Sequence, residues 1–107
     1  MKISLISGSH RQGSQSQRIS EIIRLTLKEL QPNLNSFSLD LGIEKLPLWS
    51  PEKKNGVGIW GHTWRKISEN FQESDGFVFV VPEYGGMAAP STKNLFLLCD
   101  KGELTHK

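Results

Sequence analysis

The chain has 107 residues, of which 36% are hydrophobic and 22% charged, and this suits one small globular domain. No apolar run is long enough to span a bilayer, so we expect no membrane segment, and the start of the chain lacks the pattern of a signal peptide. The net charge of +2 comes without a stripe of Lys and Arg, which excludes a typical nucleic-acid-binding surface.

The N-terminal segment predicts a strand, a polar loop and a helix, in that order. Residues 2–7 are short and largely apolar and end at Gly8, which is typical of a buried strand. After the loop, apolar residues recur at helical spacing, and Pro32 just beyond them cannot easily continue a helix. The residues that we expect on one face of this helix are Ile19, Ile22, Ile23, Leu27 and Leu30.

The middle of the chain predicts a second strand and a second helix. Phe37, Leu39 and Leu41 alternate with polar residues, as in a strand with one covered face. Residues 46–58 hold two prolines and two glycines, which favours a surface connection. Four apolar residues then recur at spacings of four, three and four, which predicts a helix with a core-facing stripe rather than a ligand-stacking one: Trp60, Trp64, Ile67 and Phe71.

Residues 76–82 give the strongest strand pattern, because every position between Gly76 and Pro82 is apolar. Continuous apolarity indicates burial on both faces, as in the middle of a parallel sheet. A glycine-rich loop (residues 83–90) follows, and a last helix is expected to begin near Ser91. The order βαβαβα predicts an α/β fold with a doubly wound parallel sheet.

The first candidate site is the loop of residues 8–16, between the first strand and its helix. The start of a helix presents unpaired backbone N–H groups, and the helix dipole favours an anion there. Arg11 adds a permanent charge suited to phosphate oxygens. No Gly-Lys-Ser/Thr follows, so a monophosphate fits better than a nucleoside triphosphate. Hydroxyl donors come from Ser9, Ser14 and Ser16, although Ser14 could also simply cap the helix.

The second candidate site is the loop that leaves the third strand, Pro82-Glu83-Tyr84-Gly85-Gly86-Met87. In open α/β sheets, ligands lie beyond the carboxyl ends of strands, near the point where the strand order reverses. We therefore expect this loop to adjoin residues 8–16. Two glycines would let a flat polar ring approach the backbone, with Tyr84 against it; the alternative is a plain turn.

Together these loops resemble the NADPH-dependent FMN reductase family, whose members include quinone, chromate and azo-dye reductases. The family pattern Gly-Ser-x-Arg-x-x-Ser-x-Asn is similar to Gly8, Ser9, Arg11 and Ser14, with Ser16 in place of Asn. The second pattern, Pro-Glu-Tyr-Asn with a later Lys-Asn pair, is similar to residues 82–85, with Gly85 in place of Asn, and to Lys93 and Asn94. The resemblance covers essentially the whole chain.

The resemblance implies a flavodoxin-like fold and an FMN site. Ser9, Arg11, Ser14 and Ser16 would hold the phosphate. Pro82, Glu83, Tyr84 and Gly85 would line the isoalloxazine ring, largely through their backbone. It further implies NADPH or NADH as electron donor and a small-molecule electron acceptor: a quinone, an azo dye, a metal oxyanion or free flavin. A homo-oligomer in the cytoplasm is expected.

The family's sheet has five parallel strands, whereas this sequence predicts three. We therefore expect residues 1–107 to form an incomplete flavodoxin-like domain without strands four and five, with the third strand as a bare edge. A truncated gene product, a fragment and a half-fold completed by a partner chain are the three explanations. The alternative function is a flavin- or phosphate-binding module or subunit, or an inactive fragment that needs a partner.

No catalytic side chain or metal site is predicted. His10, His62 and His106 are scattered, and no paired carboxylates lie in the loops. Glu83 could be mistaken for a general base, and a structural or backbone role is expected for it instead. Cys99 is the single cysteine, so the chain holds no internal disulfide, and its apolar surroundings favour a small core residue.

Overall fold

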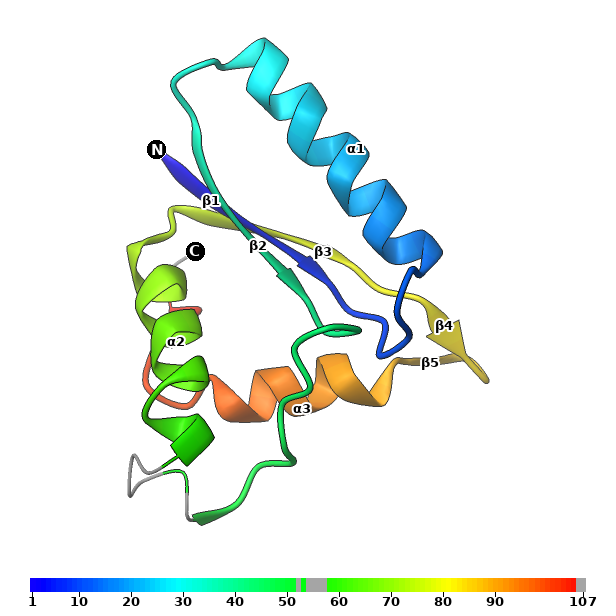
Figure 1. Cartoon of the computed structure of the whole chain (residues 1–107), viewed down its shortest axis with the longest axis vertical. Coiled ribbons are helices and arrows are strands. Elements are labelled where there is room, and N and C mark those ends of the chain that lie inside the picture. Colours follow the sequence, from blue (N-terminus) through cyan, green and yellow to red (C-terminus); the bar gives the residue numbers. More distant parts are fainter. Residues whose placement is uncertain (52, 54–57, 106–107) are drawn as a thin grey trace.

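The computed structural model describes residues 1–51, 53 and 58–105, and Figure 1 shows a sheet flanked by helices. Ser14 caps the first helix through its hydroxyl, and Pro90 opens the last one at a position where its missing N–H costs nothing. The elements in chain order are β1 Lys2–Ser7, α1 Gln15–Leu30, β2 Asn35–Asp40, η2 Gly58–Trp60, α2 Thr63–Glu73, β3 Gly76–Val80, β4 Glu83–Tyr84, β5 Met87–Ala88 and α3 Pro90–Leu98.

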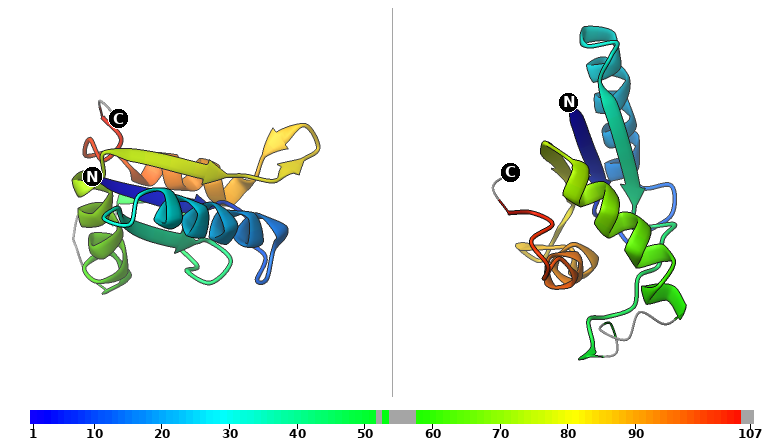
Figure 2. Two further views of the ribbon diagram at one scale, coloured as in Figure 1. Left: turned by 90° about the horizontal axis from the view of Figure 1, so that it is seen from above. Right: turned by 90° about the vertical axis from the view of Figure 1, so that its left-hand side faces the viewer.

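The main sheet has the order β2-β1-β3, and both pairings are parallel. At its centre Ile6 of β1 lies opposite Leu39 of β2 and Phe79 of β3. Helix α1 covers one face of the sheet, and α2 and α3 cover the other (Figures 1 and 2). This arrangement confirms the predicted doubly wound α/β fold, in its βαβαβα portion.

The hydrophobic core lies between the sheet and the α2–α3 layer. It contains Ile6 and Leu39 from the sheet and Leu95 and Leu98 from α3. The predicted stripe is confirmed as core packing, since Trp60, Trp64, Ile67 and Phe71 are all in this cluster. The Phe71 ring makes edge contacts with the rings of Phe37 and Phe77, with centroids 6.1 and 5.2 Å apart.

The apolar face predicted for α1 is only partly covered, and the expectation that β3 is buried on both faces is wrong. Ile19, Ile22 and Leu30 of α1 are exposed, because the helix turns Ser16 and Ser20 to the sheet and the described elements leave its other side uncovered. Strand β3 is half-buried at all five positions instead of fully buried, because it forms the edge of the sheet.

The predicted surface connection of residues 46–58 includes residues 52 and 54–57, which lie outside the described residues. Within its described part, Leu48 and Trp49 are exposed, as a surface connection requires. Lys53 is buried and pairs with Asp100 at 2.8 Å. In the described part of the chain, no helix combines the length and the apolarity needed to cross a membrane.

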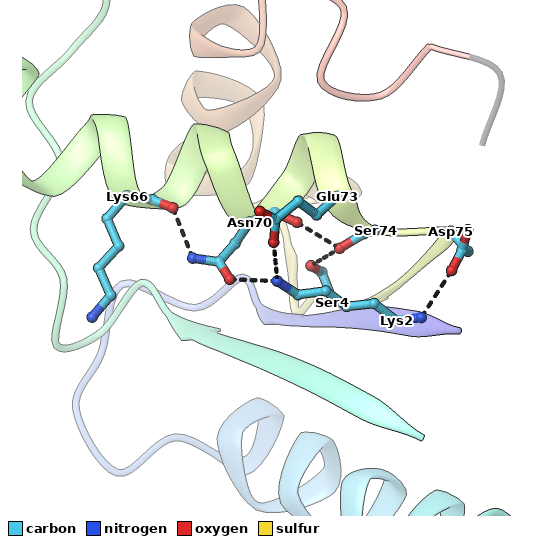
Figure 3. A network of polar contacts seen from close by, with 7 residues as sticks. All are labelled: Lys2, Ser4, Lys66, Asn70, Glu73, Ser74 and Asp75. Atoms are coloured by element: carbon cyan, nitrogen blue, oxygen red, sulfur yellow. Dashed lines mark hydrogen bonds and ion pairs between the residues drawn. The ribbon is translucent and has the colours of Figure 1, made fainter. Parts of the chain in front are cut away.

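A polar network joins the start of β1 to the turn between α2 and β3 (Figure 3). The Lys2 backbone N–H donates to Asp75 Oδ2 at 2.8 Å, and Lys2 Nζ donates to Asn70 Oδ1 at 2.7 Å. Behind them the buried hydroxyls of Ser4 and Ser74 are 2.6 Å apart. These bonds fix the register of β1 beside β3, and with it the position of the loop at the far end of β1.

Candidate functional site

The two loops singled out in the sequence leave neighbouring parallel strands at their carboxyl ends. Residues 8–16, called here the N-terminal loop, follow β1, and residues 83–88 follow β3. The Gly8 N–H donates to Val80 O at 2.9 Å, so the N-terminal loop begins directly beside the end of β3. This is the edge at which ligands bind in open parallel sheets.

The N-terminus of α1 forms the floor of the N-terminal loop. The Ser14 hydroxyl accepts the N–H of Gln17 at 3.1 Å, which satisfies one of the four N–H groups that a helix start leaves without an intrahelical partner. Capping uses an oxygen lone pair of Ser14, so its O–H can still donate. The helix has no acidic residue in its first turn, so its positive end is not neutralised locally.

Two further hydroxyls of this loop are held in place by burial. Ser9 is 2% exposed, and its Oγ accepts the N–H of Arg11 at 3.2 Å. Ser16 is 7% exposed in the first turn of α1. A buried side chain has already lost most of its rotamer freedom, so these hydroxyls are preorganised for a ligand.

Arg11 is exposed, and its guanidinium makes no hydrogen bond or ion pair with residues 1–51, 53 or 58–105. Its backbone, by contrast, is fixed: a Cβ on Gly42 would lie 2.2 Å from Arg11 O, and Lys45 Nζ donates to His10 O. A free cation on a held backbone suits an incoming anion.

The second loop is a short β-hairpin rather than an irregular loop. Strands β4 and β5 pair antiparallel, with Glu83 opposite Ala88 and Tyr84 opposite Met87. Gly85 and Gly86 form the turn with φ of 58° and 79°, as two-residue hairpin turns with two left-handed positions require. We call residues 83–88 the hairpin, and Figure 1 shows it projecting beyond the sheet.

A cleft of about 490 Å³ lies between the N-terminal loop and the residues after β3. It brings together seven of the eight residues singled out in the sequence, and Gly85, at the tip of the hairpin, does not line it. A separate cleft of about 420 Å³ lies beside α2, and none of the described residues lines both clefts. The lining residues are Ser9, Arg11, Gly13, Ser14, Gln15, Ser16, Pro82, Glu83 and Tyr84.

The start of α3 supports this site, and sequence reasoning missed its contribution. Ser91 Oγ and Thr92 Oγ1 both donate to Gly8 O, at 2.6 and 3.0 Å. A Cβ on Gly8 would meet Thr92 Oγ1 at 2.2 Å, so the absence of a side chain at this glycine makes room for α3. Pro90 is a local sequence signal for the start of a helix. It does not reveal that Ser91 contacts Gly8, because these residues are more than eighty positions apart in the chain.

The side chain of Asn94, noted in the sequence as part of a pattern, connects α3 to the segment after β2. Its Oδ1 accepts the N–H of Trp49 and its Nδ2 donates to Pro47 O, both at 2.9 Å. Both polar atoms are therefore engaged within the chain. Lys93 beside it is exposed.

Cys99 follows α3 and packs against the core cluster. Burial raises the pKa of its thiol to about 12, and the negative charge of Glu103 contributes to the same shift. A thiol with this pKa stays protonated at neutral pH, so its surroundings fit the expected role as a small core residue.

A comparison with family models shows the family of this chain, and a comparison with solved structures shows its fold. A family model described as NADPH-dependent FMN reductase matches residues 1–107. The structure of an azoreductase from Bacillus anthracis str. Sterne aligns over 94% of this chain and 55% of that one, with 21% identity and a TM-score of 0.70. The structure of the azoreductase AzrA aligns over 94% of this chain and 56% of that one, with 17% identity and a TM-score of 0.67.

These alignments confirm the flavodoxin-like fold expected from the sequence. The chain spans about half the length of the solved structures it matches. No curated protein matches it.

Proposed function

Because the chain belongs to the NADPH-dependent FMN reductase family, we propose that it binds FMN in the cleft between the N-terminal loop and the hairpin, as part of an NADPH- or NADH-dependent oxidoreductase. The observation that carries this proposal is the cleft itself. It joins a helix N-terminus, hydroxyls and the exposed guanidinium of Arg11 on one side to an aromatic residue, Tyr84, on the other.

The residues present fit a flavin monophosphate. Ser9, Arg11, Ser14 and Ser16 would donate to its phosphate, together with the open N–H groups at the start of α1. On the other side, the ring would be bounded by Pro82, Glu83 and Tyr84, which line the cleft, whereas Gly85 lies outside it in the turn of the hairpin. Bound FMN supplies the hydride and electron chemistry, while these residues bind and orient it.

The acceptor is proposed by class only. The alignment with azoreductases makes an azo dye the first candidate, followed by a quinone, a metal oxyanion or free flavin. A cytoplasmic location and a homo-oligomeric state stay predictions.

Titration of the purified chain with FMN, followed by the quenching of flavin fluorescence, tests the proposal. Arg11→Ala should weaken FMN binding about 10- to 100-fold, since a charge-assisted hydrogen bond contributes roughly 1.5–3 kcal/mol. Arg18→Ala is the matched control, because it removes the same charge from the first turns of α1 without lining the cleft. Absence of FMN binding, or equal affinities for wild type and Arg11→Ala, would contradict the assignment.

The second candidate is a flavin- or phosphate-binding module that needs a partner chain. It is favoured by β3, which among the described residues pairs with a strand on one side only. In this reading residues 1–107 are an incomplete flavodoxin-like domain. FMN binding without NADPH oxidation in the presence of a quinone would support the module, whereas turnover by the isolated chain would support the enzyme.

A further inference from the structure

One ring contact connects the two loops that form the cleft. The His10 and Tyr84 rings lie with centroids 5.6 Å apart and planes tilted by 38°. Tyr84 lines the cleft and is 37% exposed, whereas His10 is exposed and does not line it. His10 therefore contacts a residue of the cleft wall without entering the cleft.

The two partners differ in how firmly they are held. On the His10 side, Lys45 Nζ binds the His10 carbonyl and Gly42 packs against the next peptide. On the other side all six residues of the hairpin are exposed. Its strands bond to each other, and within residues 1–51, 53 and 58–105 no hydrogen bond or ion pair connects the hairpin to another element.

We propose that His10 is a positioning residue that sets the approach of Tyr84, and with it the hairpin, to the flat ring of the bound cofactor. This inference rests on the proposed FMN function and deepens it. The N-terminal loop then acts in two ways: its hydroxyls and Arg11 hold the phosphate, and His10 adjusts the far wall for the ring. Removal of His10 should therefore weaken the binding of the flat ring of the cofactor and leave the binding of its phosphate unchanged.

The first test separates the effect of His10 on binding of the cofactor ring from its effect on binding of phosphate. FMN affinity is measured by fluorescence titration, and inorganic phosphate affinity by its competition with FMN, in wild type, His10→Ala and His10→Phe. An aromatic pair contributes enough that His10→Ala should weaken FMN binding about 3- to 10-fold. His10→Phe keeps a ring and should restore wild-type affinity within about twofold, and phosphate affinity should stay unchanged in all three.

The second test needs no ligand. Tyr84 is the single tyrosine of the chain, so its ring proton signals can be followed directly by NMR. His10→Ala should shift these signals, whereas His62→Ala, which removes an exposed histidine at the start of α2, should not.

If the wild-type chain binds FMN, three results would each overturn the inference: Tyr84 signals that do not shift in His10→Ala, unchanged FMN affinity in that variant, or equal losses of FMN and phosphate affinity. The last would assign His10 to the phosphate or to the general stability of the loop. A wild-type chain that binds no FMN overturns the proposed function and this inference with it. Normal wild-type binding that His10→Ala leaves intact overturns the inference alone.

Discussion

Gly8 illustrates how a single missing side chain connects the site to the fold. Its carbonyl receives two hydroxyl groups from the start of α3, and its Cα faces Thr92 at a distance that leaves no space for a methyl group. The sequence placed Gly8 at the start of the N-terminal loop, and the structure has it there, directly after β1. The sequence could not reveal that α3 requires the glycine, because that reason lies in a residue far along the chain.

We expect Gly8→Ala to lower the free energy of unfolding by about 1–3 kcal/mol, the usual cost of overpacking, as measured by urea denaturation. The companion variant Thr92→Ala removes the atom that lies 2.2 Å from the new methyl group. The double variant should therefore lose less stability than the sum of the two single variants. Strict additivity would contradict the predicted clash.

Cys99 gives a second prediction at this scale. With its pKa raised to about 12 by burial, the thiol should react with iodoacetamide at pH 8 at least about tenfold more slowly than a free cysteine peptide, because the thiolate is the reacting form. Mass spectrometry of the intact protein follows the reaction. Addition of urea should restore the rate, and rapid labelling of the folded protein would refute the prediction.

At the scale of elements, the buried hydroxyls of Ser4 and Ser74 connect β1 to the end of α2 (Figure 3). Ser74 Oγ donates to Asn70 O at 2.8 Å, so the Ser4 hydroxyl must be the donor to Ser74. The two serines therefore differ in the number of hydrogen bonds that depend on them. Loss of Ser4 removes one hydrogen bond, whereas loss of Ser74 leaves the buried Ser4 hydroxyl without its acceptor and removes the hydroxyl that binds Asn70 O.

Thermal or urea unfolding should show this asymmetry. Ser4→Ala should cost about 1 kcal/mol, the net value of a typical hydrogen bond. Ser74→Ala should cost about 2 kcal/mol or more, because it leaves a buried hydroxyl unsatisfied. Equal losses, or a larger loss for Ser4→Ala, would show that the network is bonded in another way.

The elements also show where sequence reasoning succeeded and where it failed. The Trp60–Phe71 stripe was predictable because its partners are core residues of this same chain. The exposure of Ile19 and Ile22 was not, because a periodic pattern records that a face is apolar and not what covers it. The hairpin was missed because its strands have two residues each, too few for alternation to be visible.

At the scale of the whole molecule, α1 carries exposed apolar residues, and among the described residues β3 pairs with a strand on one side only. Both features favour association with another chain. Ile19 and Ile22 are 47% and 63% exposed, so replacing both with Lys should cost little folding energy. We expect the double variant to keep the melting temperature within about 2 °C and to self-associate less in sedimentation velocity experiments. The half-buried Ile23 is the contrast, and Ile23→Lys should lower the melting temperature clearly.

A large fall in melting temperature for the Ile19/Ile22 double variant would show that these side chains are covered in solution. If self-association is unchanged in the double variant, the β3 edge and not this face of α1 would be the expected contact surface.

The central place of β1 in the sheet also determines the order in which the chain can fold. Both of its partners are distant in sequence: Lys2 pairs with Asn35, and Ile3 with Gly76. The β1–α1–β2 unit closes the shorter loop at a lower entropic cost, so we expect it to form before β3 joins β1. Sheets made only of such non-local pairings fold slowly. Because the chain is synthesised from its N-terminus, one side of β1 also stays unpaired until residues 76–80 have left the ribosome.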